Sequence, residues 1–158
     1  MRRFAIAALS AALLPLGAQA HDYTAGDMTV IHPAIPETPP GARSAAGYFT
    51  LVNGGDAPDS LIEVRADVPA VGLHRSESVD DVMTMTPVDR VEVAPGAEVV
   101  FAPGGLHVMF MGLEAPMGEG DMVPATLVFE RAGPVEVEFS VDARETMGHG
   151  DHGDHAGH

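Results

Sequence analysis

Short apolar runs separated by turn residues make up most of the chain, and no run keeps the 3.6-residue period of a helix. Runs rich in Val, Phe, Thr and Tyr alternate with Gly, Pro, Asp and Asn, which is typical of strands joined by tight turns. The four prolines between Pro33 and Gly41 predict an extended surface loop. Many short strands at this spacing predict an all-β sandwich or barrel. The predicted strands are Met28–His32, Ala46–Asn53, Ser60–Ala66, Val71–Ser76, Val82–Val88, Arg90–Val93, Glu98–Phe101, Leu106–Leu113, Met122–Glu130 and Val135–Val141.

The two ends of the chain differ in pattern from its middle. Residues 1–20 combine two early arginines with an apolar run from Phe4 to Leu16 and an Ala-Gln-Ala motif, which is typical of a cleaved signal peptide. An apolar run of about 13 residues is too short to span a bilayer as a helix, so we expect no stable membrane insertion. The sequence therefore predicts an exported protein with one β-domain in residues 21–142. Residues 143–158 form a Gly/His/Asp-rich tail, which we expect to be disordered without a ligand.

Composition narrows the possible functions. Eight basic residues against 23 acidic ones give a formal net charge of −15, which argues against a nucleic-acid partner because phosphate binding needs a basic surface. The absence of cysteine excludes disulfide scaffolds, thiolate zinc sites and cysteine nucleophiles. The eight histidines and nine methionines are therefore the residues that stand out.

The strand predicted from Leu106 has the strongest candidate for a site. Because side chains alternate between the two faces of a strand, His107, Met109 and Met111 share one face, and their apolar neighbours belong to the core. His74 has the same arrangement, since it follows Leu73, which we expect to face the core.

Met83 and Met85 share a face of another predicted strand. Strand methionines are more often core residues than ligands, and the pattern alone does not decide between these two roles.

The donor types indicate the metal. Thioether sulfur is soft and neutral, so a site that mixes methionine with histidine favours Cu(I) over zinc, magnesium or calcium. A thioether does not oxidise to a disulfide as a thiolate does, which suits an exchangeable copper site in an oxidising compartment. These donors favour a copper carrier over a redox enzyme.

The spacing of four of these residues resembles a family signature. Ten residues separate His74 from Met85, twenty-one separate Met85 from His107, and one separates His107 from Met109. This spacing resembles the H(M)-x10-M-x21-H-x-M signature of the periplasmic Cu(A) chaperone family PCu(A)C. The resemblance covers nearly all of residues 21–142. It extends to Ala46-Gly47-Tyr48, Asn53-Gly54-Gly55-Asp56, Leu106-His107-Val108-Met109-Phe110-Met111-Gly112-Leu113 and Phe129-Glu130-Arg131-Ala132-Gly133.

The resemblance implies a cupredoxin-like Greek-key β-barrel or sandwich, located in the periplasm, that is not an enzyme. It implies that one Cu(I) is held at the surface by His74, Met85, His107 and Met109. The implied partners are the apo-Cu(A) domain of cytochrome c oxidase subunit II, which receives copper, and a Sco-type thioredoxin-like protein. We expect a monomer. The chain departs from the family pattern at Arg75, where a methionine can follow the first histidine, and at Ala34, where many members have tryptophan.

The tail and the predicted mature N-terminus are candidates for a second copper site. Histidine recurs at every third position of the tail, and imidazoles interleaved with carboxylates suit Cu(II), with a methionine available for Cu(I). His21 would combine its α-amine with its imidazole after cleavage, and His32 or a tail histidine could complete such a site. The tail residues of this prediction are Met147, His149, His152, His155 and His158.

Two other functions remain open from the residues. One is copper sequestration or resistance, in which the tail would matter more than the core site. The other is a small copper oxidase that uses His21, which would need an open coordination position and a partner base that the sequence does not show.

Overall fold

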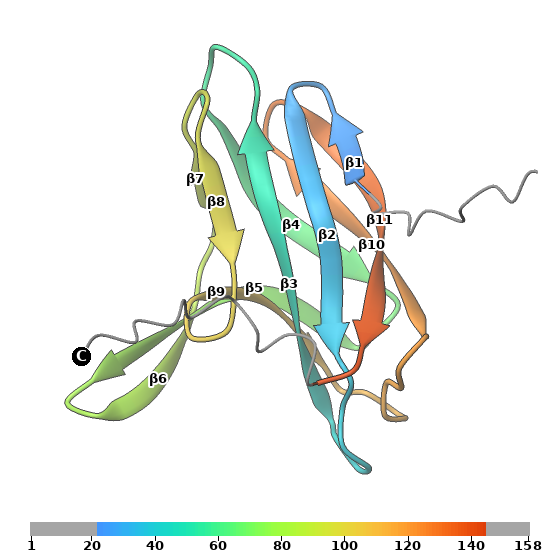
Figure 1. The fold of residues 1–158 in the computed structure, drawn as a ribbon. Helices are drawn as coiled ribbons and strands as arrows, with labels where there is room; N and C mark the ends of the chain where they lie inside the picture. The colour runs from blue at the N-terminus through green and yellow to red at the C-terminus, as the bar shows by residue number, and fades with distance from the viewer. Residues whose placement is uncertain (1–21, 145–158) are drawn as a thin grey trace, which may run out of the picture.

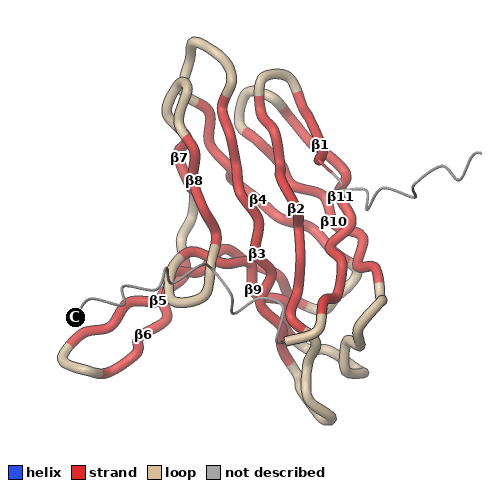
Figure 2. The backbone as a smooth tube through the Cα atoms, viewed as in Figure 1, coloured by secondary structure: helices blue, strands red, loops and turns tan. Residues whose placement is uncertain are grey.

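The computed structural model describes residues 22–144, and the predicted all-β fold class is confirmed. In these residues Figure 2 shows strands and loops and no helix. Residues 22–144 accordingly contain no helix that could cross a membrane. The strands are β1 (Asp22–Ala25), β2 (Met28–Pro36), β3 (Ser44–Asn53), β4 (Asp59–Ala66), β5 (Ala70–Val79), β6 (Val82–Pro87), β7 (Val91–Val93), β8 (Glu98–Phe101), β9 (Leu106–Met111), β10 (Met122–Phe129) and β11 (Gly133–Asp142).

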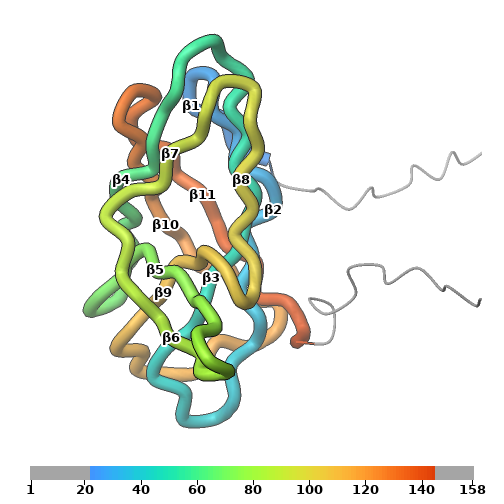
Figure 3. Tube along the Cα trace, turned by 90° about the vertical axis from the view of Figure 1, so that its left-hand side faces the viewer, coloured from blue at the N-terminus to red at the C-terminus, as the bar shows by residue number. Residues whose placement is uncertain are grey.

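The strands form one strongly curved mixed sheet in the order β6-β5-β9-β3-β2-β11-β10-β4-β7, with β1 added to β2 and β8 added to β3. All pairings are antiparallel within residues 22–144 except that of β2 with β11. Figures 1 and 3 show β2, β3 and β8 in one layer and β4, β10 and β11 in the other. Strands β5, β9 and β6 cross one end of the molecule, and the β5–β6 hairpin projects from its body (Figure 1).

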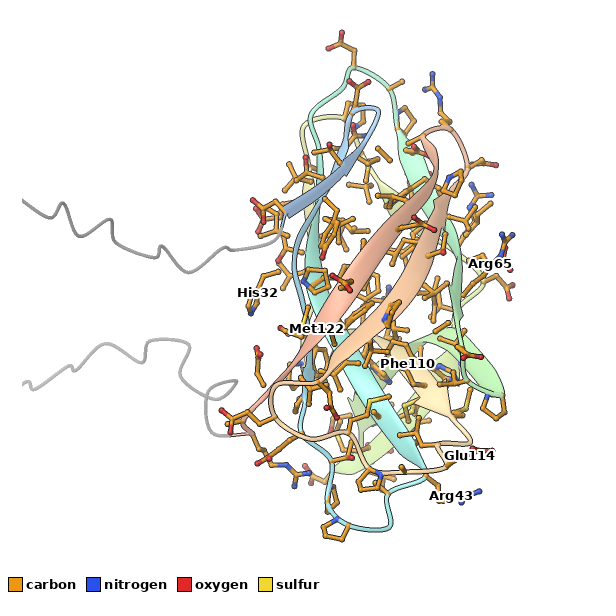
Figure 4. All side chains as sticks on the ribbon, turned by 90° about the vertical axis from the view of Figure 1, so that its right-hand side faces the viewer. His32, Arg43, Arg65, Phe110, Glu114 and Met122 are labelled. Carbon is orange, nitrogen blue, oxygen red and sulfur yellow. The ribbon has the colours of Figure 1, made fainter. Side chains whose placement is uncertain are left out.

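The core lies between the two layers and is rich in phenylalanine. Phe110 and Phe139 are fully buried and pack edge to face with ring centroids 5.4 Å apart. Figure 4 shows Phe110 inside the body, whereas His32 and Arg65 lie at its periphery. A Cβ atom at Gly47 would approach Phe139 to 2.8 Å and Phe110 to 2.9 Å, so these rings fit only against a glycine. The Ala46-Gly47-Tyr48 segment therefore serves packing at this point.

Two buried polar side chains fasten loops to the sheet. The amide of Asn53 donates to the carbonyls of Ala57 (2.8 Å) and Val93 (3.0 Å). The carboxylate of Asp59 accepts from the backbone N–H groups of Arg131 and Ala132, each at 2.9 Å. These hydrogen bonds satisfy both side chains. The segments 53–56 and 129–133 of the family pattern therefore have a structural role.

The predicted surface loop from Pro33 to Gly41 is wrong in its first part. Pro33 to Pro36 continue β2, and Ala34 and Ile35 are buried. Ala34 pairs in parallel with Ser140 of β11, at a point where the register of β2 against β3 shifts. A proline lacks only the N–H donor, and an irregular position in a strand tolerates that loss.

Other strand boundaries also differ from the prediction. β1 was not predicted, because its four residues, although they alternate between polar and apolar types, are too short a run to mark a strand. β5 extends three residues beyond Ser76 to meet β6 in a hairpin whose turn residues, Asp80 and Asp81, have φ of 51° and 61°. Two consecutive positive φ values match a two-residue hairpin turn, for which aspartate is one of the tolerated residues.

Candidate metal centre

Strand β9 presents two chemically different faces. Val108 and Phe110 are fully buried in the core, as the alternation predicts. His107 and Met109 point to the other face. His107 is only 3% exposed, whereas the resemblance implied a surface site.

Strands β5 and β9 bring the two histidines together. His74 is the direct cross-strand partner of His107, so both side chains lie on the same face of the sheet. Their rings are stacked with centroids 6.0 Å apart and planes at 21°. The site thus has a pair of imidazoles, one half-buried and one buried.

The orientation of His107 is fixed by a hydrogen bond on one side of its ring. Nδ1 lies 3.0 Å from the carbonyl oxygen of Gly105, and because a carbonyl only accepts, Nδ1 carries the proton. Nε2 of the neutral ring then has a free lone pair. This atom is buried and has no hydrogen-bond partner in the described residues. A metal-bound histidine has this arrangement, in which one ring nitrogen is held by a carbonyl and the other is left for the metal.

The carbonyl of Gly105 also accepts the backbone N–H of Ser76 at 3.0 Å. The turn before β9 therefore ties His107 to β5, the strand that carries His74. Nδ1 of His74 lies 3.4 Å from the carbonyl of Gly72, which is a weaker version of the same contact.

Met109 faces a glycine across the strands. Its cross-strand partner is Gly72, two residues before His74 on the same face. A Cβ atom at Gly72 would lie 3.4 Å from Cε1 of His74. The missing side chain leaves space beside the His74 ring, on the face of the sheet that Met109 shares.

Met85 reaches the same face from the edge of the sheet. It is the cross-strand partner of Ser76, and Ser76 shares its face with His74. Met85 is 48% exposed. The four residues of the predicted core site therefore lie on one face of β6, β5 and β9, and burial increases from Met85 at the edge to His107.

The donor set fits a soft, monovalent cation. Two neutral imidazoles and two neutral thioethers offer no charge to compensate a hard divalent ion. Residues 22–144 contain no cluster of three or more His, Cys, Asp or Glu side chains that could hold a metal ion, so a metal on this face would need the methionines.

The other predicted ligands lie outside the described residues, or apart from this face. His21, Met147, His149, His152, His155 and His158 are outside residues 22–144. His32 is on β2, where its Nε2 lies 3.5 Å from the Asp142 carboxylate. His32 is thus not part of the β5–β9 face. Neither the space at Gly72 nor the Gly105 carbonyl was predicted, although the Pro103-Gly104-Gly105 turn was visible in the sequence.

Comparisons with known proteins agree with this geometry. A family model described as LpqE-like matches residues 28–141. No curated protein matches the chain. The copper-bound PCuAC domain from PmoF2 is 32% identical, with a TM-score of 0.66 over 78% of this chain and 98% of that domain. The apo PCuAC domain from PmoF1 is 28% identical, with a TM-score of 0.67 over 78% of this chain and 99% of that domain.

A further similar structure comes from Deinococcus radiodurans. Its Cu(I)-bound protein DR1885 is 28% identical, with a TM-score of 0.55 over 80% of this chain and 83% of that one. The match of the family model over most of the chain and the similarity to PCuAC domains confirm the resemblance seen in the sequence. The chain belongs to the LpqE-like (PCuAC) family, whose members are copper-binding chaperones and not enzymes.

Proposed function

We propose that this protein is a periplasmic copper metallochaperone. It binds one Cu(I) through Nε2 of His74 and His107 and the sulfur atoms of Met85 and Met109. It then delivers the ion to the Cu(A) centre of cytochrome c oxidase. The buried Nε2 of His107, which has no hydrogen-bond partner among residues 22–144, carries the proposal, because a buried acceptor without a donor is unfavourable until a cation binds it.

The gradient of exposure supports a carrier function. His107 anchors the ion at the buried end of the site, whereas Met85 stands at the solvent end on an edge strand. A docked acceptor would meet the exposed β6 end of the site first, so the ion would leave by ligand exchange at that end. Neutral donors hold Cu(I) less tightly than thiolates would, and this favours release.

The proposed location and acceptor rest on the sequence and on the family. The pattern of residues 1–20 supports export, and a methionine site without cysteine suits an oxidising compartment. The copper-bound PmoF2 domain and Cu(I)-bound DR1885 support copper as the cargo.

Copper transfer to the apo-Cu(A) domain of subunit II tests the function. The protein is loaded with one equivalent of Cu(I) without oxygen and mixed with the apo-domain, and copper is measured in each protein after separation. We expect the copper to move to the Cu(A) domain. Met85→Leu should still bind Cu(I) but more weakly. The control Met122→Leu, which removes a similarly exposed strand methionine (44%) outside the site, should behave as the parent.

The same experiment separates delivery from sequestration. The His-rich tail would suit a protein that stores copper. Copper that stays on the loaded protein in the presence of excess apo-Cu(A) domain would contradict delivery and favour storage.

A further inference from the structure

Met83 is a fourth methionine on the face of the proposed site, beside Met85, Met109 and Met111. It precedes Met85 by two residues on β6, so both thioethers point to the same side. Its cross-strand partner is Ser78, and that of Met85 is Ser76. These small partners do not pin the long methionine side chains against the hairpin, and Met83 is 63% exposed.

The part of the hairpin that carries Met83 is two-stranded in the part of the chain that the structure describes. There β5 pairs with β9 as far as Arg75, and beyond that residue it pairs with β6 alone. All six residues of β6 are exposed, and β6 is the edge strand of the sheet. A two-stranded ribbon without a packed face is marginally stable, so packing does not hold this end of the hairpin in one position, and we expect it to bend over the site. The hydrogen bond from Ser76 N–H to Gly105 O, at 3.0 Å, holds the base of the hairpin against β9.

A methionine at this position serves neither the core nor the protection of the sheet edge. Edge strands are normally protected from pairing by charged side chains, proline or bulges. Met83 offers instead a soft, uncharged donor on a flexible side chain, on the far side of Met85 from the histidines. About 7 Å of strand separates it from Met85, given the rise per residue of a β-strand.

We propose that Met83 is a transfer ligand, which takes Cu(I) from the site on its way to an acceptor. This inference rests on the proposed function. The bond from Sδ of Met83 to Cu(I) forms as the bond from Nε2 of the more exposed histidine, His74, breaks. The copper stays Cu(I), and no proton or electron moves. A ligand of the acceptor then replaces Met83 in the same manner.

Substitution of leucine at two neighbouring positions tests this role. Met83→Leu keeps the size and apolar character of the side chain and removes the sulfur. Val82→Leu is the matched control, because Val82 is also 63% exposed but lies on the opposite face of β6. Two quantities are measured with a chromophoric Cu(I) chelator: the affinity by competition, and the rate at which the loaded protein passes Cu(I) to excess chelator.

We expect Met83→Leu to keep the Cu(I) affinity within about twofold. Its transfer rate should fall about tenfold, which corresponds to about 1.4 kcal/mol in the barrier. Val82→Leu should change neither quantity. An unchanged rate in Met83→Leu would overturn the proposal, and so would an equal slowing in Val82→Leu, since that would indicate a surface effect without sulfur. A loss of affinity as large as that of Met85→Leu would make Met83 a permanent ligand and not a transfer ligand.

X-ray absorption gives a readout independent of rates. In Met85→Leu, the sulfur of Met83 should take the vacant position, so that Cu(I) keeps two sulfur ligands, and the double variant should have one. One sulfur already in Met85→Leu would show that Met83 does not reach the ion. If the parent binds Cu(I) but transfers it no faster than Met83→Leu, the role of Met83 is overturned and the proposed function is not. If the parent binds no Cu(I), both are overturned.

Discussion

The rings of His74 and His107 lie face to face across β5 and β9, with centroids 6.0 Å apart. The Gly105 carbonyl accepts hydrogen bonds from Nδ1 of His107 and from the backbone N–H of Ser76, which lies on the strand that carries His74. The two nitrogen donors are therefore set in the apo-protein by backbone contacts. Such preorganisation lowers the entropy that metal binding must offset.

The space at Gly72 should be necessary for the site. In Gly72→Val the added side chain crowds the His74 ring on the face that Met109 shares, while a β-branched residue suits the strand. We expect the Cu(I) affinity to fall at least about tenfold, that is by about 1.4 kcal/mol, with the fold retained. Competition with a Cu(I) chelator measures the affinity. Ala70→Val, on the same face of β5 opposite Met111, is the matched control, and an equal loss of affinity in this variant would contradict the role of Gly72.

Asn53 should contribute to stability and not to copper binding. Asn53→Ala leaves the buried carbonyl of Val93 and the half-buried carbonyl of Ala57 without their donor, so the free energy of unfolding should fall by about 2–3 kcal/mol. Urea denaturation measures this change, and Cu(I) affinity should stay at the parent value. Asp56→Ala, at an exposed position in the same loop, should change stability little. A copper affinity that falls in Asn53→Ala at temperatures where the variant is folded would mean that this loop reaches the site.

Burial raises the pKa of the Tyr48 phenol above its usual value of 10.0. The folded protein therefore keeps this proton over a pH range in which the unfolded chain releases it. The contribution of Tyr48 to stability is complete below about pH 10 and is lost as the pH rises through the folded pKa. The chain has two tyrosines and no tryptophan, so the alkaline absorbance titration of Tyr23→Phe reports Tyr48 alone. We expect a midpoint above 10 that returns to about 10 in guanidinium. A midpoint below 10 in the folded protein would contradict the desolvation of this side chain.

The tail histidines should bind Cu(II) without taking part in the Cu(I) site. Replacement of all four by alanine in the full chain should remove most Cu(II) binding and leave the Cu(I) affinity unchanged. Binding to neutral imidazole should weaken below about pH 6, since the usual histidine pKa is about 6.5. Calorimetric titration with Cu(II) measures both effects. Unchanged Cu(II) binding after the replacement would assign that binding to His21 or to the core. The replaced residues are His149, His152, His155 and His158.

Local patterns predicted the strands well where alternation was clear. The buried Val108 and Phe110 and the opposite-facing His107 and Met109 follow from the period of two. The burial of Ile35 could not be predicted in the same way, because it depends on parallel pairing with β11, a strand about a hundred residues later in the chain. β1 is fixed in part by hydrogen bonds between Tyr23 and the backbone of Glu138, and such contacts leave no local signal.

The residues alone predicted the types of donor, and the family resemblance implied which four form one site, but not how the strands arrange them. The alignment of Met85 with His74 depends on the register of β5 against β6. That register follows from the Asp80–Asp81 turn, which has no glycine to mark it in the sequence. The sequence showed that Met83 and Met85 share a face, because they are two residues apart in a predicted strand. It did not show that this face is the one that carries His74 and His107. Burial of His107 and the role of the Gly105 carbonyl are properties of the folded chain alone.

X-ray absorption of the protein loaded with one equivalent of Cu(I) without oxygen counts the ligands of the ion. We expect two nitrogen and two sulfur ligands in the parent. In Met109→Leu we expect two nitrogen ligands and one sulfur ligand, with circular dichroism showing the fold unchanged. A copper ion with nitrogen and oxygen ligands only, or a spectrum of Met109→Leu identical to that of the parent, would contradict the assignment of the site to this face of β5, β6 and β9.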